Sequence, residues 1–199
     1  MFQAPDKGFT TLINEKRLIT NDKINFNGAY HKIEKEDYNH GTDYENGKPT
    51  RYVDTPYLGS PVFFFKNGIV GFEYALILDS SYFLQGLKKY GTGEKAYAYK
   101  WGVYQIKDDT IKAIIYITYL GRFLHGTTQL LQSNFEGYLQ NNGTIIGWHL
   151  VPPYPPVAMS INEDYFKFLT TPRDLYFKKV PIEGLVDPDK VWINKYRKK

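Results

Sequence analysis

The 199-residue chain contains no cysteine, which excludes disulfide bonds, thiol catalysis and zinc sites built on sulfur ligands. It also contains no apolar run near the length of about 18 residues that a membrane-spanning helix needs. Residues 1–8 lack the apolar stretch of a secretory signal peptide. We therefore expect either a cytoplasmic protein that starts at Met1 or a mature form in which Met1 replaces a leader.

Sequence patterns that carry known chemistry are also missing. The four histidines, at positions 31, 40, 125 and 149, form no H-x-x-x-H pair, and the chain has no G-x-S-x-G motif. Residues 91–95 (GTGEK) lack the spacing of a phosphate-binding loop. The adjacent acids Asp108 and Asp109 lie at a predicted hairpin tip, which does not provide the contrasting environments that general acid–base catalysis uses. We predict no catalytic residues, no metal site and no cofactor.

Aromatic residues are abundant, at 17% of the chain, with 18 tyrosines and 13 phenylalanines. Both residue types favour β-sheet. The length and the 42% hydrophobic content fit a single domain over residues 1–199 with a proper core. The net charge is +4, and much of the excess lies at the C-terminus, in Lys195, Arg197, Lys198 and Lys199. We interpret this end as a solvated terminus and expect no nucleic-acid partner.

Three segments, residues 62–72, 104–114 and 137–148, have the pattern of β-hairpins: two apolar runs around a tight polar break. The breaks Asn67-Gly68, Asp108-Asp109 and Asn142-Gly143 supply the positive φ angles of two-residue turns. Such turns predict the cross-strand pairs Phe65–Val70, Phe63–Phe72, Ile106–Ile111, Tyr104–Ala113, Leu139–Ile146 and Gly137–Trp148.

The faces of these hairpins differ. The 62–72 hairpin is apolar on both faces, so we expect it to be covered on both sides. The 104–114 hairpin has one apolar and one polar face, and a slip of one residue would bury Lys107 and Lys112, so its register is well determined.

The remaining elements follow from shorter signals. We expect residues 1–22 to be an irregular leader, with a first strand that places Ile24, Phe26, Gly28 and Tyr30 on one face. Residues 34–60 form either a long loop or an exposed hairpin around Asn46-Gly47. Helices are predicted over 80–91 and 162–169, and a strand over 174–180. We expect the strands to form a β-barrel over residues 23–180. Residues 181–199 would follow as a helix that Asp187 caps and a tail.

The segments 63–70 (FFFKNGIV) and 100–112 (KWGVYQIKDDTIK), together with Gly28-Ala29-Tyr30, resemble motifs of a group of uncharacterised bacterial envelope lipoproteins with a lipocalin-like (calycin) barrel. The resemblance implies a location in the periplasm or at the outer membrane. It also implies a removed leader that ends in a lipid-carrying cysteine. The lipocalin signature itself is altered, because Tyr30 stands where G-x-W has tryptophan and Thr42-Asp43-Tyr44 follows Gly28 too early.

These observations together predict an antiparallel lipocalin-like β-barrel of about eight strands with short helices, one near the C-terminus; a β-sandwich is the alternative. A barrel of this size either closes on its own side chains or holds one small ligand. We predict a non-enzymatic binding protein of the bacterial envelope that holds a small apolar or amphipathic ligand. Its contacts would be the barrel-facing residues Tyr30, Tyr104, Ile106, Ile111 and Trp148, for which ordinary core packing is the competing interpretation.

The alternative function is a structural or protein-interaction module of the envelope, with a filled barrel and no ligand. In that case the polar 34–60 segment would be the partner surface.

Overall fold

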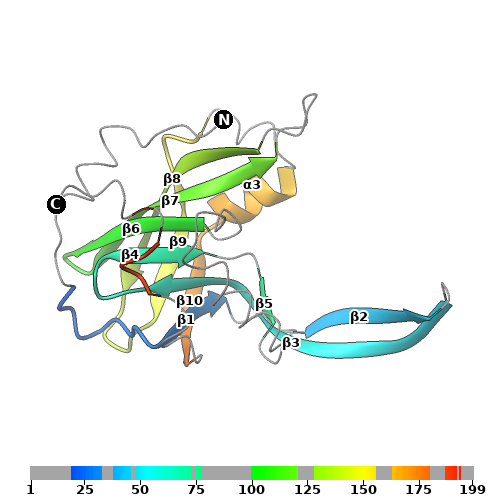
Figure 1. Cartoon of the computed structure of the whole chain (residues 1–199). Coiled ribbons are helices and arrows are strands. Elements are labelled where there is room, and N and C mark those ends of the chain that lie inside the picture. The colour runs from blue at the N-terminus through cyan, green and yellow to red at the C-terminus, as the bar shows by residue number, and fades with distance from the viewer. Residues whose placement is uncertain are drawn as a thin grey trace.

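The computed structural model describes residues 19–32, 38–45, 48–72, 75–77, 100–120, 128–155, 163–179, 187–191 and 193. Eight antiparallel strands follow one another around a closed barrel, and the last returns to the first (Figure 1). They are β1 (Gly28–Lys32), β3 (Lys48–Phe64), β4 (Ile69–Phe72), β6 (Lys100–Lys107), β7 (Thr110–Leu120), β8 (Thr128–Leu139), β9 (Ile145–Val151) and β10 (Arg173–Lys179). The predicted lipocalin-like barrel is confirmed, and the sandwich alternative is wrong.

Strand β1 closes the barrel because it pairs on both sides. Tyr30 lies opposite Phe177 of β10 and opposite Val62 of β3. Closure leaves no free edge in this part of the sheet, which removes the usual route to edge-to-edge aggregation. The helix α3 (Glu163–Thr170) connects β9 to β10 and matches the helix predicted over 162–169. Strand β10 matches the strand predicted over 174–180.

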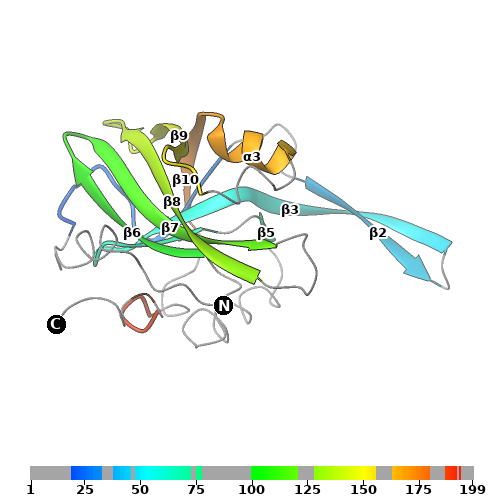
Figure 2. The same cartoon turned by 90° about the horizontal axis from the view of Figure 1, so that it is seen from above.

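Two further strands lie off the barrel. The short β5 (Ala75–Ile77) pairs with β3. Strand β2 (Tyr38–Glu45) pairs with the first part of β3 to form a two-stranded arm that extends away from the barrel (Figures 1 and 2). Of the two alternatives for residues 34–60, the structure shows the hairpin. Thr42-Asp43-Tyr44 lies in this arm and not in the barrel wall.

The register of the β6–β7 hairpin agrees with the prediction, with Ile106 opposite Ile111 and Tyr104 opposite Ala113. Asp108 and Asp109 have φ angles of 48° and 61°. Two consecutive left-handed residues make the two-residue turn that suits the twist of a hairpin.

The other two hairpins are shifted by one residue from the predicted pairs. Val70 lies opposite Phe64 instead of Phe65, and Ile145 instead of Ile146 lies opposite Leu139. Each turn is a three-residue loop in which only the glycine is left-handed, with φ of 80° at Gly68 and 82° at Gly143. Such a glycine serves equally well in a three-residue loop, so Asn-Gly alone did not determine the turn length.

The predicted contact between Gly137 and Trp148 is nevertheless present. A Cβ atom at Gly137 would lie 3.2 Å from the Trp148 ring. The register of β8 and β9 shifts by one residue between Glu136 and Tyr138. On the side of this shift away from the turn the predicted register holds, and Glu136 pairs with His149.

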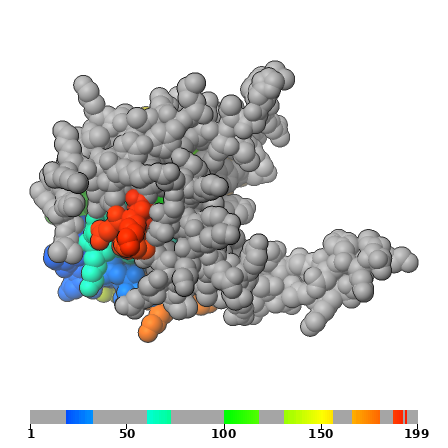
Figure 3. Space-filling view, in the orientation of Figure 1, coloured from blue at the N-terminus to red at the C-terminus, as the bar shows by residue number. Residues whose placement is uncertain are grey.

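Both faces of the β3–β4–β6 wall are buried, as predicted for the 62–72 hairpin. Val62, Phe64, Val70 and Phe72 belong to the barrel core, and the alternate positions are buried on the outside: Phe63, Ile69, Trp101 and Val103. The C-terminal segment lies beside this hairpin (Figure 3), and the Asn67 side-chain amide donates a 2.9 Å hydrogen bond to Asp189 Oδ1. Val191 and Ile193 of the same segment are buried.

The predicted C-terminal helix is represented in the described residues by a capped turn and one 3-10 residue, Ile193. The Asp189 backbone N–H donates to Asp187 Oδ1 at 3.1 Å, and the Lys190 N–H donates to the Asp187 carbonyl at 3.0 Å. Asp187 therefore caps this turn. The helix predicted over 80–91 lies outside the described residues. Within the described part of the chain, no helix is long and apolar enough to cross a membrane.

Candidate functional site

The five residues predicted to contact a ligand come together inside the barrel. Tyr30, Tyr104, Ile111 and Trp148 belong to one buried core cluster, and Ile106 packs against it partly buried. Each is at most 5% exposed apart from Ile106. They enter the core from four strands, which explains why the pattern of alternation found them. Their role as ligand contacts stays a prediction.

Aromatic rings bridge the interior between strands that are not neighbours. Phe64 of β3 meets Trp148 of β9 with ring centroids 5.9 Å apart, and Phe72 of β4 meets Phe135 of β8 at 6.1 Å. Trp148 and Phe135 also stack, at 5.5 Å and an interplanar angle of 12°. Because the Phe64–Trp148 and Phe72–Phe135 contacts cross the barrel, side chains fill the barrel interior at the position of these rings. Phe64 was not among the predicted contact residues, although its alternation with Val62 is a signal that could have found it.

The hydroxyls of Tyr30 and Tyr104, which belong to the core cluster, have backbone partners. The Asn25 N–H donates to Tyr30 Oη, and Tyr104 Oη donates to the Phe65 carbonyl, both at 2.9 Å. Burial raises the pKa of Tyr30, and burial followed by the proximity of Tyr30 raises that of Tyr104. Both phenols are therefore neutral hydrogen-bonding groups that stabilise the core. The buried indole N–H of Trp148, by contrast, has no acceptor among the residues that the structure describes.

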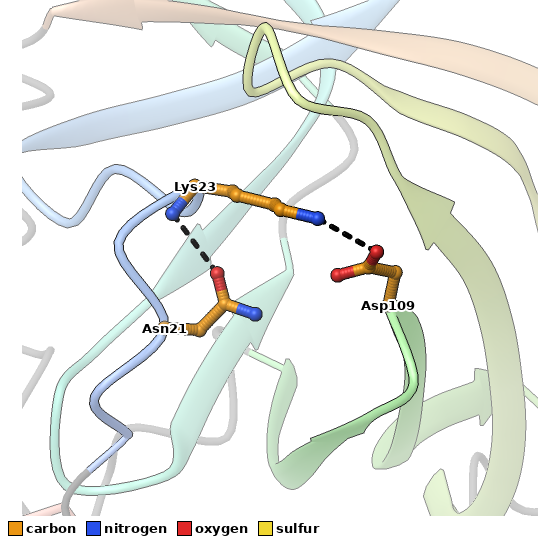
Figure 4. Close-up of polar contacts among 3 residues, drawn as sticks. All are labelled: Asn21, Lys23 and Asp109. Atoms are coloured by element: carbon orange, nitrogen blue, oxygen red, sulfur yellow. Dashed lines mark hydrogen bonds and ion pairs between the residues drawn. The ribbon is translucent and has the colours of Figure 1, made fainter.

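The end of the barrel that carries the β6–β7 and β8–β9 turns is covered by residues 19–27. Ile24 of this segment is part of the core, and Phe26 packs against it. Lys23 Nζ lies 2.7 Å from Asp109 Oδ2 at the β6–β7 turn, and the Lys23 N–H donates to Asn21 Oδ1 at 2.9 Å (Figure 4). An ion pair and apolar packing together hold the segment across this end.

A groove of about 470 Å³ lies outside the barrel, where α3 passes into β10 beside the end of β1. This volume is within the range of small-molecule sites, roughly 300 to 1,000 Å³. The groove is lined by Lys32, Lys167, Phe168, Thr171, Pro172, Arg173, Asp174 and Tyr176.

Arg173 builds the wall between the helix and the strand. Its Nη1 donates a 2.9 Å hydrogen bond to the Phe168 carbonyl, and its guanidinium lies 4.2 Å from the centre of the Phe168 ring. That carbonyl is one of the last four of α3, which have no partner within the helix. Thr171 satisfies another, because its hydroxyl donates to the Lys167 carbonyl at 2.7 Å. The capped end of α3 and the buried Arg173 therefore form an ordered wall of the groove.

The groove combines positive charge with aromatic surface. Among the described residues that line it are three cationic side chains, those of Lys32, Lys167 and Arg173, and one carboxylate. That carboxylate, Asp174, accepts a 3.0 Å hydrogen bond from the Gly147 N–H. The Tyr176 ring is 38% exposed. Such a surface suits a ligand with an anionic group and an apolar part.

The groove was not predicted from the sequence. The run 167–176 (KFLTTPRDLY) mixes basic and aromatic residues, but it was assigned only to a helix and a strand. Lys32 is remote from this run in the sequence and reaches it only through the pairing of β1 with β10.

Within the part of the chain that the structure describes, no three histidine or acidic side chains form a group that could hold a metal ion. No known protein family matches the chain, and searches of curated proteins and of solved structures find no match either.

Proposed function

We propose that the protein is a non-enzymatic binding protein of the bacterial envelope that holds a small amphipathic ligand with an anionic group. The binding site we propose is the groove between α3 and β10. The observation that carries the proposal is the cluster of Lys32, Lys167 and Arg173 around the exposed ring of Tyr176. The envelope location is supported by the resemblance of residues 63–70 and 100–112 to envelope lipoproteins.

The groove is favoured over the barrel interior for a steric reason. A ligand among Tyr30, Tyr104 and Trp148 would have to displace the Phe64 ring, which contacts all three of these side chains. Opening a packed core by the volume of a ligand removes many dispersion contacts at once. The groove needs no such rearrangement.

The test is calorimetric titration with dodecanoate, and with dodecanol as the uncharged match. We expect saturable binding of dodecanoate and at least tenfold weaker binding of dodecanol, because a charge-assisted hydrogen bond contributes about 1.5–3 kcal/mol. Lys167→Gln and Tyr176→Ala should each weaken dodecanoate binding about fivefold or more. Lys112→Gln and Tyr138→Ala, which alter an exposed lysine and an exposed tyrosine outside the groove, are the matched controls.

Equal affinity for dodecanoate and dodecanol would contradict the proposed site. So would unchanged affinity in the Lys167 and Tyr176 variants.

The alternative function, a protein-interaction module, is supported by the β2–β3 arm. A two-stranded ribbon is marginally stable by itself and presents edges on which another strand can pair. Among the described strands, β2 pairs only with β3, so its outer edge is open to pairing with a strand of another copy. Sedimentation would show self-association of the full chain that disappears when residues 38–56 are replaced by a short Gly-Ser linker.

A further inference from the structure

A second basic cleft lies at the opposite end of the β1–β10 pair from the groove. It has a volume of about 360 Å³ and is lined by Ile24, Asn25, Phe26, Asn27, Lys66, Phe177 and Lys179. Three separate parts of the chain form it: the covering segment of residues 19–27, the β3–β4 turn and the end of β10.

The walls of this cleft are held in place by contacts with the core. The Phe177 ring packs against Tyr30 with centroids 5.4 Å apart, and Ile24 is buried. The Ile19 N–H donates to the Lys66 carbonyl at 2.8 Å, which ties the covering segment to the β3–β4 turn. A site whose walls are already ordered loses little conformational entropy when a ligand binds.

The described lining of the cleft is positively charged. Lys66 and Lys179 are both exposed, and none of the described residues that line the cleft is a carboxylate. Lys66 Nζ lies 5.8 Å from the centre of the Phe26 ring, which holds the ammonium group over an aromatic face. The side-chain amides of Asn25 and Asn27 add uncharged hydrogen-bond donors.

We propose that this cleft binds the phosphate group of a phosphate monoester. A phosphate monoester carries a charge of about −1.5 to −2 and three strong acceptor oxygens. It therefore matches two ammonium groups and two amides better than a singly charged carboxylate does. The Phe26 and Phe177 rings form the apolar part of the lining, beside which the organic group of the ester would lie. This inference is independent of the ligand proposed for the groove.

The experiment is titration of the full chain with phenyl phosphate at constant ionic strength, followed by calorimetry and by backbone amide shifts in NMR spectra. We expect saturable binding, with the largest shifts at residues 24–27, 66 and 177–179. Lys66→Gln and Lys179→Gln should each weaken binding about tenfold, the loss expected for one charge-assisted hydrogen bond.

The matched control is Lys178→Gln, since Lys178 is an exposed lysine next to Lys179 that does not line the cleft. It should leave phenyl phosphate binding within twofold. An equal loss in all three variants would mean general charge attraction and would overturn the proposal, as would a titration that does not saturate. Thermal denaturation of each variant checks that it is folded.

Vesicles distinguish a free phosphate ester from a lipid headgroup. Phosphatidic acid presents a phosphate monoester at a membrane surface, and phosphatidylcholine vesicles are the control. Binding to phosphatidic acid vesicles that phenyl phosphate displaces, and that Lys66→Gln weakens, supports the site with a lipid as the source. Binding of phenyl phosphate alone supports it with a soluble ester. Binding to neither probe overturns it.

Discussion

The rings of Phe64 and Trp148 meet edge to face with centroids 5.9 Å apart, although β1 and β10 separate their strands along the barrel wall. This contact places a phenylalanine at the centre of an aromatic group, because Phe64 also meets Tyr30 at 5.5 Å and Tyr104 at 4.8 Å. The barrel is thus stabilised by packing across its interior as well as by the hydrogen bonds of its wall.

Phe64→Ala should lower the free energy of unfolding by about 3–5 kcal/mol, the usual cost of removing a buried phenylalanine ring. Urea denaturation followed by tryptophan fluorescence measures it. Tyr138→Ala is the control, because Tyr138 is 49% exposed, and it should change stability by no more than about 0.5 kcal/mol. A loss below about 1 kcal/mol in Phe64→Ala would show that the interior is not packed as described.

Arg173→Met should destabilise the junction of α3 and β10. The variant keeps much of the apolar contact with Phe168 but loses the donor to the Phe168 carbonyl, so we expect a loss of about 1.5–3 kcal/mol. Hydrogen exchange should show faster opening of residues 163–171 than of β7 and β8. Equal acceleration throughout the barrel would mean that Arg173 does not act locally on the helix end.

Stability should fall as the pH rises above about 10, the ordinary pKa of tyrosine. Because burial raises the pKa values of Tyr30 and Tyr104, the unfolded chain releases these two protons at lower pH than the folded one. The contribution of these two phenols to the free energy of unfolding is fully present below pH 10. Above pH 10 this free energy falls by up to about 1.4 kcal/mol per pH unit for each group. Urea denaturation between pH 9 and 11.5 tests this expectation.

Tyr104→Phe should reduce the slope of that pH dependence, and Tyr138→Phe serves as the control for removal of a surface hydroxyl. An unchanged slope in Tyr104→Phe would contradict the assignment of the effect to the buried phenol.

The ion pair between Lys23 and Asp109 should make a small and salt-dependent contribution. The two side chains are 28% and 46% exposed, so a double-mutant cycle with Lys23→Gln and Asp109→Asn should give a coupling energy of about 0.2–1 kcal/mol. The coupling should decrease in 1 M NaCl, where the screening length is about 3 Å. A salt-independent coupling would indicate that the hydrogen bond, and not the charge, joins the segment to the turn.

Much of the wall could be predicted from the sequence because its signals are local. The 104–115 segment alternates between apolar and polar residues around Asp108-Asp109, and both properties allow only one register. The Asn-Gly turns were less informative, since a single left-handed glycine fits loops of two or three residues. That difference of one residue moved Phe64 to a position opposite Val70.

By itself, the sequence determined the fold class, the register and the apolar face of the β6–β7 hairpin, and the absence of cysteine chemistry. Only the tertiary structure decided which rings meet across the barrel. It alone also placed Lys32 and Lys167 in one groove, and Lys66 and Lys179 in one cleft. The physical reason is the range of the interactions. Alternation and turn geometry act between near neighbours in the chain, whereas a groove or a bridged core depends on where barrel closure brings distant strands together.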